Sequence, residues 1–236
     1  MKFLSKKLYF ILFFVCCVQL NAQAMPSPNA ILHSVYQKMM KVKDYSADLK
    51  IQSEIPLIKI MPVSAKVYFK QKDKFKIITK GIAILPKQGF NDLAKIIKDS
   101  TSYLAVSAGN EKINNRLTQI IHLIPNNDTS DLIIAKFWVD VNVGLILKSQ
   151  LTTKSNGNLQ INYEYDPIGK PYGLPHHLVF TVDVKKFKIP KALAADVNKT
   201  QRSKMQSESK SKTGSIDIRL TNIQINKGID DKIFKK

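Results

Sequence analysis

The stretch AKVYFKQKDKFKIIT, residues 65–79, decides the fold class of this chain. Apolar and polar side chains alternate on both sides of the polar turn at residues 71–74, and alternation with a period of two is typical of strands with one buried and one solvated face. The stretch therefore predicts a β-hairpin whose solvated face is nearly all lysine. The residues expected on the buried face are Ala65, Val67, Phe69, Phe75, Ile77 and Thr79.

The segment that precedes this hairpin supplies a further strand and a cover for its apolar face. Residues 45–55 alternate in the same way, with Tyr45, Leu49 and Ile51 on the apolar side. Ahead of them, Ser27 and Pro28 are typical of a helix N-cap and first helical position. Apolar side chains then follow at helical spacing through residue 42. We expect an amphipathic helix over residues 27–43 to lie on the sheet.

The rest of the chain predicts an antiparallel meander. Asn156-Gly157 is the strongest hairpin signal, and Gly109-Asn110 is read as the turn after the fourth strand. A second helix is expected over residues 90–97. About ten consecutive strands joined by tight turns predict a curved sheet that curls towards a barrel, with a core that is either packed or hollow. The later strands are expected at 103–107, 119–124, 133–140, 145–153, 159–165, 177–184 and 215–226.

The first 24 residues are typical of a cleaved export signal. Lys2, Lys6 and Lys7 precede an apolar run at residues 8–18, and Ala22-Gln23-Ala24 provides a small-x-small cleavage pattern. We expect cleavage after Ala24, a periplasmic location, and one domain over residues 25–236. Both cysteines lie inside the leader, so the expected mature chain has no disulfide. A polar, low-complexity loop near 198–213 is expected to be mobile.

The charge of the chain is strongly positive, at +19, and three of its lysines but no acid lie in the expected leader, which leaves +16. Nucleic-acid recognition favours arginine forks and aromatic platforms. Here the only arginines are Arg116, Arg202 and Arg219, and the lysines are spread along strands and turns. We expect no nucleic-acid partner. The pattern favours a solvated surface that protects sheet edges, or attraction towards anionic lipid headgroups.

No residue pattern indicates catalysis or a metal site. His176 and His177 are adjacent, and neighbouring strand residues point to opposite faces, so they cannot chelate one ion together. Asp230 and Asp231 follow Gly228 closely and are read as a turn or cap. Nucleophile-elbow, phosphate-loop and HExxH motifs are absent from the sequence. We therefore expect no catalytic residue, no metal and no cofactor.

Several short motifs together resemble a known family. They are YSADL at 45–49, the hairpin at 65–79, FWVD at 137–140, Leu147-Lys148, Asn156-Gly157, and NKGIDD at 226–231 with Phe234. This order of features resembles the LolA/LolB-like lipoprotein-carrier superfamily, which includes outer-membrane lipoprotein-sorting proteins. The resemblance implies an unclosed antiparallel half-barrel whose helices form a lid over a hydrophobic cavity for acyl chains. It implies a monomeric carrier of a lipid or lipoprotein, with inner- and outer-membrane transport components as partners.

The resemblance and the alternation together select candidate site residues. Carriers of this type use an arginine in the second strand to hold the lid closed, and Gln71 stands at the matching position here. The lid would be residues 27–43 and 81–99. The same alternation also fits a filled core, so it does not decide between a ligand cavity and a core filled by side chains. The expected cavity-lining residues are Tyr45, Leu49, Ile51, Val67, Phe69, Phe75, Ile77, Phe137, Val139, Leu147, Ile161 and Tyr163.

Two other functions remain alternatives. The first is a periplasmic sensor or assembly module that binds a protein partner through a strand edge or the basic loop. The second is an enzyme acting on lipids, which would need a nucleophile or base in the cavity, and the sequence offers no candidate for that role.

Overall fold

The computed structural model describes residues 26–55, 61–72, 74–79, 90–155, 157–183 and 213–235. The expected leader, the first part of the second lid segment and nearly all of the polar loop near 198–213 lie outside these residues.

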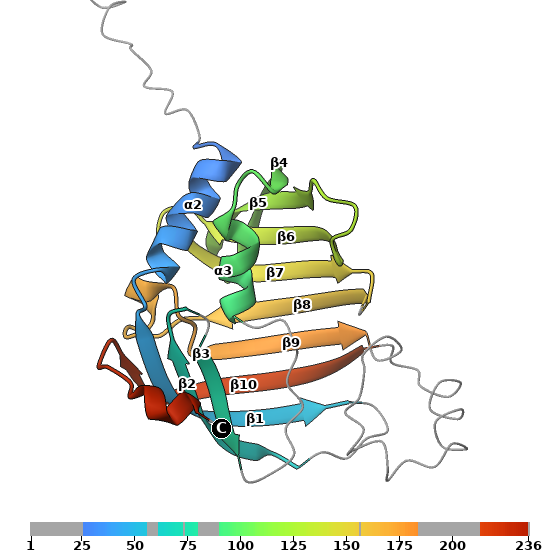
Figure 1. Cartoon of the computed structure of the whole chain (residues 1–236). Helices are drawn as coiled ribbons and strands as arrows, with labels where there is room; N and C mark the ends of the chain where they lie inside the picture. Colours follow the sequence, from blue (N-terminus) through green and yellow to red (C-terminus); the bar gives the residue numbers. More distant parts are fainter. Residues whose placement is uncertain are drawn as a thin grey trace, which may run out of the picture.

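The described strands form one antiparallel sheet of ten strands in the order β3-β2-β1-β10-β9-β8-β7-β6-β5-β4. The two end strands, β3 and β4, do not pair with each other, so the sheet is curved but unclosed (Figure 1). The predicted unclosed antiparallel sheet of about ten strands is confirmed, but its order is not that of a simple meander, because β3 and β4 lie at opposite ends and β1 pairs with β10. Their bounds are β1 Asp44–Glu54, β2 Val63–Lys70, β3 Lys74–Thr79, β4 Tyr103–Ile113, β5 Arg116–Pro125, β6 Leu132–Asp140, β7 Leu145–Thr153, β8 Gly157–Glu164, β9 His177–Asp183 and β10 Thr213–Ile225.

Two α-helices, α2 (Pro28–Met39) and α3 (Phe90–Lys98), lie on the same face of the sheet (Figure 1). The Ser27 side chain accepts a hydrogen bond from the Ala30 amide, 3.2 Å away, which confirms the predicted N-cap. Two short 3₁₀ helices complete the fold, η1 at Lys170–Tyr172 and η2 at Asp231–Phe234. Among the described residues, the helices are too short or too polar to cross a membrane.

The pairing of β1 with β10 joins the two ends of the chain. Every other pairing links strands that are consecutive in sequence, whereas here Leu49 faces Leu220 and Ile51 faces Ile218. Alternation predicts both strands but carries no signal for which strands pair across such a separation. This pairing places the α2–β1 junction beside the C-terminal segment.

The turn predicted at Gly109-Asn110 is wrong. β4 continues to Ile113, and the chain reverses at Asn114 and Asn115, whose φ angles of 47° and 62° are those of a tight hairpin turn. Gly109 instead lies at a register shift between Ser107 and Asn110, with φ of 95°. A glycine with positive φ is as typical of a β-bulge as of a turn, and here the two asparagines form the turn.

Candidate functional site

The concave face of the sheet is apolar, and α2 and α3 cover it. Ile31, Leu32, Val35 and Met39 on α2 are buried in the same cluster as the strand residues. Most of the candidate cavity residues are buried too, and all of those except Leu147 belong to this cluster. The buried candidates are Tyr45, Leu49, Ile51, Val67, Phe137, Val139, Leu147, Ile161 and Tyr163.

The candidates on the β2–β3 hairpin are more exposed. Phe69 and Ile77 are half-buried against the core, and the Phe69 ring lies 5.3 Å from the ring of Tyr45. Phe75 faces Phe69 across the hairpin but is 50% exposed. Because β3 is an end strand of the described sheet, none of the described strands shields Phe75 on its far side. The apolar face therefore continues to the open rim of the sheet.

A register shift changes the face expected for the start of β7. Trp138 pairs with Lys148, but Val139 pairs with Ile146, so Leu147 has no direct partner on β6. Ile146 joins the main core cluster opposite Val139, whereas Leu147 is buried outside that cluster. Strict alternation selected Leu147 because a bulge shifts the side-chain period without leaving a clear mark in sequence.

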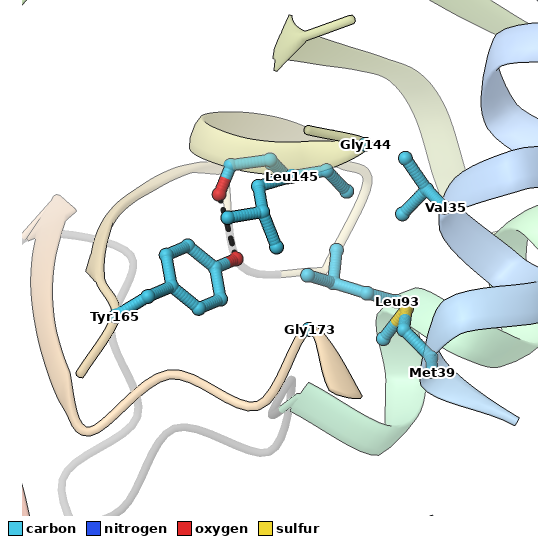
Figure 2. Close-up of a pocket in the computed structure, with 8 residues that line it drawn as sticks. Val35, Met39, Leu93, Gly144, Leu145, Tyr165 and Gly173 are labelled. Atoms are coloured by element: carbon cyan, nitrogen blue, oxygen red, sulfur yellow. Dashed lines mark hydrogen bonds between the residues drawn. The ribbon is translucent and has the colours of Figure 1, made fainter. Parts of the chain in front are cut away.

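A small pocket lies where the helices meet the sheet (Figure 2). Val35 and Met39 of α2, Leu93 of α3, and Leu145 and Ile146 of β7 line it together with Gly144, Tyr165 and Gly173. Its free volume is about 10 Å³, which is room for at most a single water molecule. An acyl chain could therefore enter only if the helices move away from the sheet.

Tyr165 is the pocket residue that sequence analysis missed most clearly. It shares the alternation of Ile161 and Tyr163, which was a usable signal. Its hydroxyl donates a hydrogen bond to the Ile146 carbonyl at 2.7 Å (Figure 2). Burial raises its pKa well above the ordinary value, so at neutral pH Tyr165 is a fixed hydrogen-bond donor rather than a reactive phenolate.

Two side-chain amides hold the C-terminal end of α2, and we call Gln71 and Asn226 the α2 clamp. Gln71 Nε2 donates to the Met40 and Val42 carbonyls, 3.0 Å away in each case. Asn226 Nδ2 donates to the Lys41 carbonyl at 2.9 Å, and its Oδ1 accepts from the Lys43 amide at 2.7 Å. The Gln71 position selected by the resemblance thus contacts the helix end, whereas the role of Asn226 depends on the β1–β10 pairing.

The C-terminal segment secures the β2–β3 hairpin beside this clamp. Asp231 accepts hydrogen bonds from Lys70 and Lys74, both at 2.8 Å, and these contacts lower the pKa of its carboxyl to about 2. Asp230 is the N-cap of η2 and accepts from the Lys232 amide, which confirms the expected cap. Neither carboxylate points to acid–base chemistry.

Trp138 and His177 lie on the convex face, because their strand neighbours Phe137, Val139 and Leu178 belong to the core cluster. Trp138 donates to Glu111 and lies under the Lys148 ammonium, 4.1 Å from the ring centre. His177 is buried between Glu164 at 3.1 Å and Asp217 at 2.8 Å. Within the described part of the chain, no group of three or more His, Cys, Asp or Glu side chains is arranged to hold a metal ion.

By sequence, no family model and no curated protein matches this chain. Solved structures do match it. A domain named for outer membrane lipoprotein sorting, from Vibrio parahaemolyticus, has a TM-score of 0.57 and 9% identity. The match covers 88% of this chain and 96% of that chain. A LolA superfamily protein from Nitrosomonas europaea has a TM-score of 0.56 and 12% identity, with 89% of this chain and 98% of that chain covered.

A DUF1329 family protein from Desulfovibrio piger is similar to the same degree, with a TM-score of 0.55, 12% identity, and coverage of 89% of this chain and 98% of that one. At such identities the likeness concerns the fold alone. The chain therefore has the LolA-like fold, an open antiparallel half-barrel with helices on its concave face.

Proposed function

We propose that this protein is a periplasmic carrier that binds the acyl chains of a lipid or lipoprotein between its sheet and its helices, and delivers them towards the outer membrane. The observation that carries the proposal is the continuous apolar concave face, which α2 and α3 cover in the described part of the chain. No catalytic step is part of the proposal. The leader-like residues 1–24 support export, and one of the similar structures is named for lipoprotein sorting.

Binding an acyl chain offers enough free energy to open such a lid. Each buried CH₂ is worth about 0.8 kcal/mol, so a sixteen-carbon chain represents on the order of 12 kcal/mol before costs. About half of that, roughly 6 kcal/mol, would give a dissociation constant of tens of micromolar. The other half is available to separate α2 and α3 from the sheet, and this division would keep the affinity low enough for release to an acceptor.

The arrangement of polar contacts supports a hinge at the C-terminal end of α2. The α2 clamp fixes the backbone of residues 40–43 to the sheet. Between the clamp and its N-terminus, α2 is held mainly by apolar contacts, with one hydrogen bond from Lys38 to the Val143 carbonyl. Opening would therefore swing the N-terminal part of α2, together with α3, away from β7.

The test is native mass spectrometry of the protein purified from the periplasm of its own host, followed by solvent extraction of the bound material. We expect a co-purifying lipid or acylated peptide. A mass equal to that of the bare chain, unchanged after incubation with host lipids, would overturn the proposal.

A second candidate function follows from the free edge of β4. This end strand pairs only with β5 in the described sheet. Leu104 and Val106 of β4, and Ile124 of β5 opposite Leu104, expose their side chains by 42–57%. Unpaired apolar edges are where an extended segment of a partner protein adds a strand. If the partner binds the β4 edge, Leu104→Lys with Val106→Lys would abolish partner binding. If it binds the basic loop instead, deletion of residues 200–212 would do so. The same changes would leave lipid binding intact under the carrier proposal.

A further inference from the structure

Three lysines gather beside the pocket between α2, α3 and β7. Lys38 lies in the last turn of α2, and Lys41 follows the C-cap residue Met40. Lys170 begins η1, in the loop between β8 and β9 that returns against α2. Lys41 and Lys170 are exposed, whereas Lys38 is half-buried.

The stem of Lys38 forms part of the pocket mouth. Its Cγ and Cδ lie 3.6 Å from the point that a Cβ would occupy on Gly173, and its Cε lies 3.9 Å from the same point on Gly144. Both glycines line the pocket. The Lys38 ammonium then reaches the Val143 carbonyl. The charged end of this side chain therefore lies at the rim while its methylenes cover the apolar interior.

The positive charge at this rim has little compensation. Burial lowers the pKa of Lys38, and the neighbouring charges of Lys41 and Lys170 lower it further, while Asp140 raises it. Asp140, however, is already paired with Arg116, whose Nη2 lies 2.7 Å from Oδ2 and whose Nε lies 2.8 Å from the same oxygen. Asp166, whose Oδ1 accepts a hydrogen bond from the Gly169 amide 2.6 Å away, adds one carboxylate to the loop that carries Lys170. The three lysines outnumber it, so an anion placed between them would still meet net attraction.

We propose that Lys38, Lys41 and Lys170 form a binding site for the anionic headgroup of an amphiphile whose acyl chain enters the adjoining pocket. The inference rests on the proposed carrier function and names its ligand class, a lipid with a phosphate-type negative headgroup. Lysine ammonium groups bind phosphate as point charges without the planar geometry that arginine imposes. The apolar pocket and the cationic rim thus match the two halves of one ligand.

The experiment measures lipid extraction from vesicles by the purified protein. Vesicles carry trace phosphatidylglycerol or phosphatidylcholine with identical fluorescent acyl chains. After incubation they are removed by flotation in high salt, which screens attraction between exposed charges. The test variant is Lys41→Gln with Lys170→Gln, which leaves the Lys38 hydrogen bond in place. The matched control is Lys50→Gln with Lys112→Gln, because both of these lysines are exposed on strands and the net charge changes equally.

We expect the wild-type protein to extract phosphatidylglycerol at least about tenfold better than phosphatidylcholine, since the lysines attract the anionic headgroup and not the neutral one. The Lys41/Lys170 variant should lose about tenfold for phosphatidylglycerol alone, and the control variant should match the wild type. An equal loss in both variants would show general surface attraction and overturn the headgroup site.

The other outcomes separate this inference from the carrier proposal. Extraction of neither lipid would contradict the carrier itself, whereas equal extraction of both would overturn only the headgroup site. Glycerol phosphate, measured by calorimetry, distinguishes the source of the anion. If it binds the wild type and not the Lys41/Lys170 variant while extraction is the same for both, the lysines bind a free phosphate ester and the lipid assignment is wrong.

Discussion

The side chain of Gln71 caps the helix that covers the sheet: its Nε2 lies 3.0 Å from the carbonyl oxygen of Met40 and 3.0 Å from that of Val42. The backbone N–H of Gln71 also donates a hydrogen bond to the Lys43 carbonyl, 2.8 Å away. Carbonyls at a helix C-terminus have no partner within the helix, so a donor from outside stabilises that end. The β2–β3 hairpin therefore holds α2 in place with a neutral amide where the family resemblance leads one to expect an arginine.

Gln71→Ala should loosen the lid without unfolding the sheet. Two hydrogen bonds at a partly exposed site are worth about 1–2 kcal/mol in total. We expect faster hydrogen exchange in residues 28–43 and faster lipid exchange. Gln71→Arg should restore both, because a guanidinium also offers two donors to these carbonyls.

The matched control is Gln52→Ala, because Gln52 lies on the solvated face of β1 and contacts only the exposed Glu54 side chain. It should leave exchange in α2 unchanged. In the wild type, lipid binding should alter exchange in both α2 and α3. If lipid altered exchange in neither helix, the lid hypothesis would be wrong.

The other half of the clamp predicts a difference between two asparagines. Asn226 and Asn222 both have positive φ, 57° and 51°, so substitution by alanine imposes a similar backbone cost at each. Asn222 donates only to the Asp48 carboxylate at the surface, whereas Asn226 bonds the backbone on both sides of Val42. We expect Asn226→Ala to cost about 1–2 kcal/mol more than Asn222→Ala, measured as the free energy of unfolding in urea. Equal costs would contradict the clamp.

The clamp also marks the limit of what the sequence could predict. Period-two alternation and turn residues predicted all ten strands, and Ser27-Pro28 predicted the start of α2, because these are local signals. Asn226 contacts Lys41 and Lys43 only because β10 pairs with β1. No local pattern encodes that pairing. The sequence therefore contains the motif with Asn226 but does not predict that Asn226 contacts the end of α2.

Bulges account for the other differences. Gly109 is predicted to be a turn residue because glycine with positive φ occurs both in turns and in β-bulges. Alternation predicts that Leu147 faces the core. Residues 145–147 are all apolar, so the sequence does not show that a register shift brings Ile146, rather than Leu147, opposite Val139. The pocket lining at Leu93 and Val35 depends on how helices pack on the sheet, which alternation along a strand does not describe.

Buried tyrosines predict a loss of stability at high pH. Burial raises the pKa of Tyr45, Tyr163 and Tyr165 above the ordinary value of 10.0. Above about pH 10 the unfolded chain releases these phenol protons while the folded protein retains them, so ionisation favours the unfolded chain. Stability should therefore fall as the pH rises from about 10 towards the folded pKa values, by about 1.4 kcal/mol per pH unit for each tyrosine.

Tyr45→Phe isolates one of these contributions. Burial alone raises the pKa of Tyr45, so the variant should match the wild type closely at neutral pH. Between about pH 10 and about pH 11 its stability should fall less steeply, by about 1 kcal/mol over that unit, because the unfolded phenol is only partly ionised there. Urea unfolding across this range provides the measurement. An unchanged slope would mean that the Tyr45 hydroxyl is solvated in the folded protein.

Two leucines distinguish an opening lid from a permanently filled core. Leu93 on α3 is 2% exposed and lines the pocket, while Leu123 on β5 is 1% exposed within the sheet. Leucine-to-alanine changes at fixed core sites cost about 2–5 kcal/mol. Leu123 does not line the pocket, so we expect Leu123→Ala to fall in the upper half of that range and to affect lipid retention less than Leu93→Ala. Because α3 must leave the sheet when a chain enters, Leu93→Ala should cost about 2 kcal/mol or less.

Lipid retention provides the second measurement on the same pair. Truncating Leu93 removes contacts to a bound chain and weakens the closed lid, so the lipid should dissociate faster from Leu93→Ala than from Leu123→Ala. Dissociation can be followed as transfer of a fluorescent lipid to acceptor vesicles. Equally severe destabilisation of the two variants, with no difference in transfer, would show that the concave face is a filled core and that the acyl chain binds elsewhere or not at all.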